Sequence, residues 1–163
     1  MKLIRMVKLS VCIDMIFSEL PFLDRISAVA DIGYPAFEFW GWTSKYIEGI
    51  QKKKRNLGLA VAAFCVDPVV RIVDYTTKDT FIKNVKASIE IAHMLECPSL
   101  LVTVGNEMET VTRAKQHKSI VNCLVKAAKI VEKADITIVL EPLNVLVDHK
   151  GYYLYFSSEG FQI

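Results

Sequence analysis

The residue of this chain best placed to do chemistry is a carboxylate at the end of an apolar run. Residues 136–140 are apolar or β-branched, Glu141 follows them, and Pro142 cannot donate to a ladder, so a strand must stop there. Ligands bind at the carboxyl ends of parallel strands, because the loops leaving those ends meet at one mouth. Glu141 could bind a divalent metal there or act as a base. The alternative is a carboxylate that caps the next turn or pairs with a lysine.

Aromatic residues surround a second acid. Glu38 lies in residues 37–42, where strand alternation places it on one face with Trp40. A charged residue among aromatics needs a hydrogen-bond partner, so we interpret Glu38 mainly as an internal acid that fixes neighbouring strands or loops. Trp40 and Trp42 could form the apolar wall of a small-molecule pocket, and core packing explains them equally well.

Two further segments carry polar side chains after predicted strands. Asn106 and Glu107 follow the fourth of these strands, where they could line a loop or cap a helix. His149 lies in a loop before Gly151 and is a candidate ligand contact. Alone, such residues are typical of many enzymes and specify none.

Strands alternating with helices must position these residues. Apolar residues recur at 3.6-residue spacing between the strand-like segments, and Gly33, Gly58 and Pro98 fall where helices should end. This alternation predicts an α/β protein with a parallel sheet. The predicted strands are 7–13, 36–40, 59–66, 99–104 and 136–141, with four complete helices and the start of a fifth at 157–159.

The spacing of the strands favours a barrel. Strand starts lie one βα unit apart, and no Gly-rich phosphate loop follows any strand, so a nucleotide-binding doubly wound sheet is disfavoured. No linker or composition break divides residues 1–163. We therefore expect a single domain containing a partial (βα)8 barrel of about five strands and four to five helices.

Composition excludes several partners. The 163 residues are 52% hydrophobic with a net charge of +2, which gives no electrostatic footprint for nucleic acid or an anionic membrane. The basic run 52–55 has helical spacing and is interpreted as a solvated helix face, or alternatively as an anion contact. The four cysteines are far apart in apolar sequence, as free thiols of a cytoplasmic protein would be. Polar residues interrupt the N-terminal apolar runs before they reach signal-peptide or membrane length.

Seven short segments, taken in order, carry a family resemblance. They include the motif from Glu141 to Asn144, and together they resemble the hydroxypyruvate isomerase-like branch of the xylose isomerase-like TIM barrels, the sugar phosphate isomerases and epimerases. The segments are 8–14, 37–42, 61–65, 104–107, 116–117, 140–144 and 148–153.

The resemblance implies an eight-stranded barrel that binds magnesium or manganese through two glutamates, an aspartate and a histidine or similar ligand. It makes Glu141 both a metal ligand and a catalytic residue, acting on a small sugar or hydroxycarbonyl substrate through an enediolate. The candidate substrate-binding residues are Trp40, Trp42, Asn106, Glu107, Asn144 and His149.

The chain departs from that family pattern after the fifth predicted strand. The other metal ligands would lie beyond residue 163, so we expect a truncated barrel whose divalent site is weak or absent. Two readings stay open: an isomerase or epimerase with an incomplete site, or a non-catalytic remnant that associates with itself or a partner. A metal-dependent endonuclease of the same superfamily fits less well, because no basic groove is visible. Two open strand edges predict a homodimer or a higher oligomer.

Overall fold

A computed structural model of the chain describes residues 7–163. Strands and helices alternate through these residues, as the sequence predicts. The strands are β1 (Ser10–Cys12), β2 (Ala36–Phe39), β3 (Ala60–Cys65), β4 (Ser99–Val102) and β5 (Thr137–Leu140). The helices are α1 (Phe22–Asp31), α2 (Ile47–Leu57), α3 (Lys78–Leu95), α4 (Arg113–Val131) and α5 (Ser157–Gly160), with 3₁₀ turns at Tyr75–Thr77 and Glu132–Ala134. The basic N-terminal segment 1–6 lies outside the described residues.

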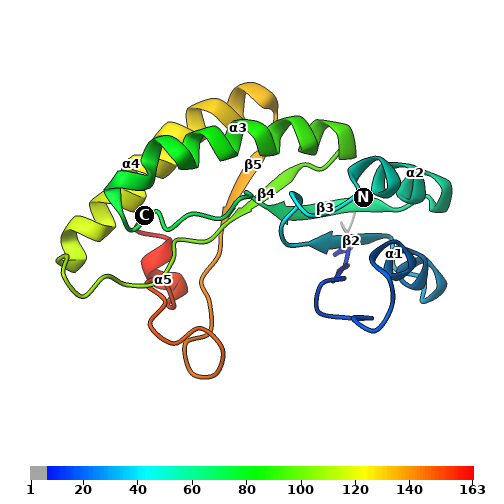
Figure 1. The fold of residues 1–163 in the computed structure, drawn as a ribbon, viewed down its shortest axis with the longest axis horizontal. Helices are drawn as coiled ribbons and strands as arrows, with labels where there is room; N and C mark the ends of the chain where they lie inside the picture. Colours follow the sequence, from blue (N-terminus) through cyan, green and yellow to red (C-terminus); the bar gives the residue numbers. More distant parts are fainter. Residues whose placement is uncertain (1–6) are drawn as a thin grey trace, which may run out of the picture.

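Within residues 7–163 the strands form one parallel sheet in the order β1-β2-β3-β4-β5. Each strand pairs with its neighbour in sequence, and the helix between them returns the chain to the starting end of the sheet. Helices α1 to α4 contact one another in sequence order. The chain after β5 forms a long loop, orange in Figure 1, before it reaches α5. Successive units placed side by side in this way are the arrangement of a (βα)n barrel.

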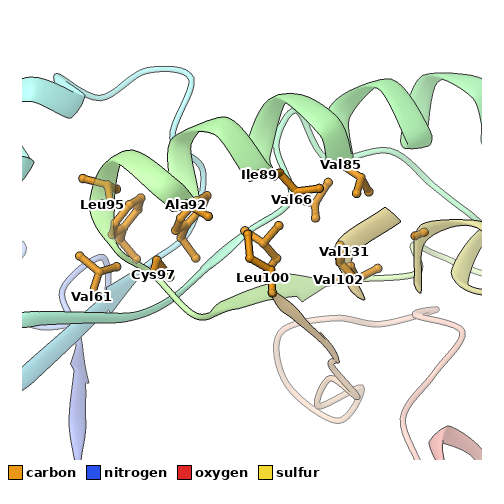
Figure 2. Packing of buried hydrophobic residues seen from close by; sticks show 14 of the residues in the cluster. Val61, Val66, Val85, Ile89, Ala92, Leu95, Cys97, Leu100, Val102 and Val131 are labelled. Carbon is orange, nitrogen blue, oxygen red and sulfur yellow. The ribbon is translucent and has the colours of Figure 1, made fainter. Parts of the chain in front are cut away.

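Alternate residues of each strand face the helices and form the core. Leu100 and Val102 of β4 are almost completely buried against α3, whose apolar side chains point at them in Figure 2. Phe39 of β2 stacks on Phe64 of β3 with ring centroids 5.2 Å apart, and both rings are fully buried. This side of the sheet is called the helix face below, and the opposite side, towards which the sheet curves, the concave face.

A register shift in β2 and β3 decides which residues reach each face. Phe37 pairs with Val61, but the next residue, Glu38, pairs with Ala63, so Ala62 is an extra residue in β3. Beyond that bulge the side-chain alternation changes phase. Phe64 consequently joins the helix face and Cys65 joins the concave face.

Helix ends follow the predicted stops. Gly58 ends α2 with a φ of 68°, a left-handed conformation that glycine adopts without steric cost. Gly33 has a φ of 78° between α1 and β2, and Pro98 stands between α3 and β4. Within the described residues no helix is both long enough and apolar enough to cross a bilayer.

Two sequence expectations are wrong in detail. The first strand was predicted over 7–13 but covers only Ser10–Cys12, and Val7 is 85% exposed. Its ladder begins at Ser10 because Ser10 pairs with Ala36, the first residue of β2. The basic run was interpreted as a solvated helix face, or alternatively as an anion contact, yet Lys54 is only 4% exposed and its Nζ lies 2.5 Å from Glu96 Oε2 of the same chain.

Candidate active site

The candidate site is a pocket of about 500 Å³ on the concave face, at the carboxyl ends of the strands. Its ionisable lining residues are Glu38, Glu141 and His149, and its two thiols are Cys12 and Cys65. The other lining residues are mostly apolar: Met15, Phe39, Trp40, Val69, Leu101, Thr103 and Leu143. A mainly apolar pocket with a few convergent polar groups is the usual form of a small-molecule site.

Glu141 enters this pocket from the end of β5. Its backbone N–H donates to Val102 O at 3.0 Å, and its carbonyl accepts from the Tyr152 hydroxyl at 3.2 Å. Burial raises the pKa of the half-buried Glu141 carboxyl, and the charge of Glu38 raises it further, while His149 acts in the opposite direction. A carboxylate with a raised pKa is a stronger base than a solvated one and is a common feature of catalytic sites.

Glu38 reaches the same pocket from β2 and also joins two strands. Its Oε2 accepts a hydrogen bond from Ser10 Oγ of β1 at 3.0 Å. This contact agrees with our interpretation of Glu38 as an internal acid that fixes neighbouring strands. The carboxylate therefore has a structural partner and also contributes negative charge beside Glu141.

The two tryptophans lie in different environments. Trp40 is 50% exposed at the rim of the pocket, and its backbone N–H donates to the Asp14 carboxylate at 2.7 Å. Trp42 packs against the hydrophobic core, where its Nε1–H donates to Ser88 Oγ at 2.9 Å. Strand alternation would place both on one face, but β2 ends at Phe39, so the chain turns between them. The core contact is the observed environment of Trp42, and its role as a ligand contact stays a prediction.

Three other predicted ligand contacts lie outside the lining of this pocket, and each has a structural partner. Asn106 forms an isolated antiparallel bridge with Tyr152. The Glu107 carboxylate accepts from Arg113 Nη1 at 3.0 Å, and Asn144 Oδ1 accepts from the Leu146 N–H at 2.9 Å. Their substrate contacts remain predictions, whereas His149 does line the pocket.

Sequence reasoning missed the two thiols of the pocket. Cys12 pairs with Glu38 in the β1–β2 register, so its side chain lies on the concave face beside Glu38. Strand alternation in the sequence was the signal that would have placed it there. Burial raises the pKa of both thiols, and that of Cys65 reaches about 12, with the charges of Glu141 and Asp67 adding to the effect. Both therefore stay protonated at neutral pH and are poor nucleophiles. All four cysteines are free, as predicted.

The described residues do not form a ready-made metal centre. Among residues 7–163, no group of three or more histidine, cysteine, aspartate or glutamate side chains is placed to hold a metal ion. Glu38, Glu141 and His149 share one pocket without forming such a group. A divalent ion needs several oxygen ligands, so these residues do not fit a complete magnesium or manganese site.

The sequence of the chain matches one protein family and one distant relative with a name. The family described as "Xylose isomerase-like TIM barrel" matches residues 26–158. A Streptomyces coelicolor protein named "Putative hydroxypyruvate isomerase" is 23% identical over 152 residues, which cover 84% of this chain and 54% of that protein.

Solved structures share the fold at low identity. The crystal structure of AP endonuclease, family 2, from Brucella melitensis has a TM-score of 0.88 and 22% identity, covering 96% of this chain and 63% of that chain. The 3-keto-D-glucoside 4-epimerase YcjR from E. coli has a TM-score of 0.66 and 18% identity, covering 78% of this chain and 53% of that one. Identities this low relate the folds alone, and the chain spans less than two thirds of each of these proteins.

Proposed function

Because the chain belongs to the family of xylose isomerase-like TIM barrels, we propose that its concave pocket is the proton-transfer part of a sugar or hydroxycarbonyl isomerase or epimerase site. The five parallel strands match part of such a barrel, which confirms the predicted fold. Relatives of the chain include sugar isomerases and epimerases. The observation that carries the proposal is the position of Glu141, half-buried at the end of β5 and directed by the strand into the pocket.

Glu141 acts as the base in this proposal. Its carboxylate takes the proton from a hydroxyl-bearing carbon next to a carbonyl, which leaves an enediolate, and it then returns that proton to the neighbouring carbon while the hydroxyl proton moves to the former carbonyl oxygen. This return isomerises the substrate, whereas epimerisation needs a second acid, such as water, that delivers a proton to the opposite side of the same carbon. The raised pKa of Glu141 assists, because a stronger base removes a weakly acidic proton more readily.

Other residues of the pocket bind the substrate in this proposal. The Trp40 ring at the rim offers an apolar surface to the carbon skeleton, and His149 can hydrogen-bond a hydroxyl or carbonyl oxygen. We also propose that Glu141 would bind a magnesium or manganese ion weakly, because one carboxylate supplies few of the oxygen ligands such an ion needs.

Deuterium exchange tests the first step without needing complete turnover. The purified chain is incubated in D₂O with hydroxypyruvate or dihydroxyacetone, and loss of the proton signal next to the carbonyl is followed by NMR. We expect exchange faster than in buffer, and a rate about 10²- to 10⁴-fold lower for Glu141→Gln, since that is what one general base usually contributes. Glu90→Gln is the matched control, because Glu90 is an exposed residue of α3. Exchange no faster than in buffer, or equal in both variants, would contradict the proposal.

A second candidate function is self-association without catalysis. An apolar groove of about 490 Å³ runs between α4 and β5, lined by residues such as Leu124, Val125 and Ile138. Within the described sheet β5 has a paired strand on one edge only, and Val139 of β5 is 40% exposed. An unpaired apolar edge of this kind favours pairing with a second chain.

Sedimentation at micromolar concentration distinguishes this candidate. We expect a dimer or higher oligomer that Val125→Glu weakens, because Val125 lines the groove and is 52% exposed. Leu146→Glu is the control, since Leu146 is 85% exposed in the loop after β5 and does not line the groove. A stable monomer, or equal dissociation by both variants, would exclude association through this groove.

A further inference from the structure

The loop after β5 folds back onto the loop after β4. The Tyr153 N–H donates to Gly105 O at 3.1 Å, and the Glu107 N–H donates to Gly151 O at 2.8 Å. The isolated bridge between Asn106 and Tyr152 lies between these two bonds. Residues 151–153 thus run antiparallel to residues 105–107, which places the Tyr152 side chain against the ends of β4 and β5.

The Tyr152 hydroxyl makes two hydrogen bonds to backbone groups of different strand ends. It accepts from the Val104 N–H at 2.7 Å and donates to the Glu141 carbonyl at 3.2 Å. Tyr152 is only 4% exposed, so water cannot readily replace either bond. Burial raises the pKa of Tyr152 to about 12, and its phenol therefore keeps the proton that it donates to Glu141.

Glu141 is consequently held on both sides of its Cα. Its N–H is fixed by Val102 O of β4, and its carbonyl is fixed by the Tyr152 hydroxyl. Tyr152 also contacts His149, which lines the pocket: its N–H donates to His149 O at 3.0 Å, and the two rings lie 6.4 Å apart.

We propose that Tyr152 is a positioning residue of the candidate site, fixing the strand end that carries Glu141 and the loop that carries His149. This inference rests on the proposed function, but the contacts of Tyr152 can be tested without turnover. Tyr152 does not line the pocket and is not a catalytic residue. Its effect passes through the backbone of Glu141 and through the loop that carries His149.

Tyr152→Phe tests the proposal, with Tyr153→Phe as the matched control. Both side chains are buried tyrosines, but the Tyr153 hydroxyl lies 3.4 Å from Arg113 O, away from Glu141. In Tyr152→Phe we expect hydrogen-exchange protection of the Val104 amide to fall by about tenfold or more, because a buried donor loses its acceptor. We also expect the carboxyl ¹³C signal of Glu141 and the ring signals of His149 to shift, and neither change to occur in Tyr153→Phe.

Turnover supplies a readout that general destabilisation would not produce. In the deuterium-exchange reaction, Tyr152→Phe should lower kcat by tenfold or more with little change in KM, because the base is misplaced while the pocket remains. If the unaltered chain shows no exchange, the proposed function fails, but the shifts of Glu141 and His149 still decide the positioning role. Unchanged Val104 protection and unchanged Glu141 and His149 signals in Tyr152→Phe, or equal changes in Tyr153→Phe, would overturn the inference.

The unaltered chain offers a second measurement in case Tyr152→Phe does not fold. The Val104 amide should exchange with D₂O at least about tenfold more slowly than an unpaired amide, because the enclosed Tyr152 hydroxyl accepts its proton. Exchange of the Val104 amide as fast as in an unfolded peptide would mean that it is not paired with the Tyr152 hydroxyl, and would overturn the inference.

Discussion

The two faces of the sheet are built from alternate residues of the same strands, yet they differ in what covers them. On the helix face, Phe64 and Val102 are buried by helices that the chain itself supplies. On the concave face, Glu141 is half-buried and Val139 is 40% exposed. The comparison indicates that stability resides mainly on the helix face, whereas the groups able to do chemistry lie on the concave face. A side chain's energetic role therefore depends on the face it occupies more than on its strand.

The largest expected effect is the truncation of a core ring. Phe64→Ala should lower the free energy of unfolding by about 3–5 kcal/mol, because it removes a fully buried aromatic side chain and leaves a cavity. The same substitution at two valines compares the two faces of the sheet directly. Val102→Ala on the helix face should cost about 2 kcal/mol and Val139→Ala on the concave face less than about 1 kcal/mol. Urea denaturation measures all three, and equal losses for the two valines would remove the distinction between the faces.

A buried hydroxyl gives the next largest effect. Ser88 Oγ accepts from Trp42 Nε1 at 2.9 Å and from the Asp67 N–H at 3.2 Å, between α3 and the strand ends. Ser88→Ala should cost about 2–3 kcal/mol, because it leaves two enclosed donors without an acceptor. The control is Ser99→Ala, a half-buried serine of β4 for which we expect a change within about 0.5 kcal/mol. Similar losses of unfolding free energy in both variants would mean that the contacts of the helix face do not contribute more to stability than those of the concave face.

Substitution of Glu141 should stabilise the chain, whereas the substitutions above destabilise it. The pKa of Glu141 is raised in the folded chain by burial and by Glu38, so its contribution to stability is complete below the ordinary glutamate pKa. That contribution is lost as the pH rises through the raised value, because the folded state then holds a partly buried charge. Glu141→Gln should therefore be more stable than the unaltered chain at pH 7, by less than Ser88→Ala loses, and this gain should disappear at pH 4.

Urea denaturation of both chains at the two pH values provides the measurement, with Glu90→Gln as the control that should show no such gain. A loss of stability in Glu141→Gln at pH 7 would mean that the ionised carboxylate has favourable partners on the concave face.

Metal binding should have the smallest effect. One carboxylate gives a dissociation constant of about 1 mM or weaker, so 1 mM Mn²⁺ should stabilise the chain by no more than about 0.4 kcal/mol. Thermal unfolding with and without Mn²⁺ measures this shift, and calorimetric titration measures the affinity. A sub-micromolar site lost in Glu141→Gln would show that the concave face holds more ligands than Glu141.

Much of the fold could be predicted because each strand–helix unit is encoded locally. The apolar run that ends at Glu141 and Pro142 gives β5, and the left-handed stop at Gly58 lies next to the helix that it ends. The position of Glu141 at a strand end followed from the same local pattern. Signals of this kind lie within a few residues of the structure they determine.

The remaining features depend on residues that meet only in the folded chain. Lys54 is buried because Glu96, 42 residues later, accepts from it, and Trp42 is turned into the core by Ser88, 46 residues later. The length of β1 is set by where β2 begins. Tyr152 belongs to a segment that carried the family resemblance, yet its hydroxyl meets Val104 across 48 residues, which no spacing rule indicates.

The extra residue Ala62 has a consequence for how related chains can change in length. Deleting that one residue would make Val61 and Ala63 regular neighbours opposite Phe37 and Glu38, so Phe64 would stay under the helices and Cys65 would stay in the pocket. A single-residue gap in a regularly paired strand exchanges the two sides of that strand, but a gap at Ala62 removes only the bulge. Related chains should therefore be able to lose a residue at this position without exchanging the two sides of β3.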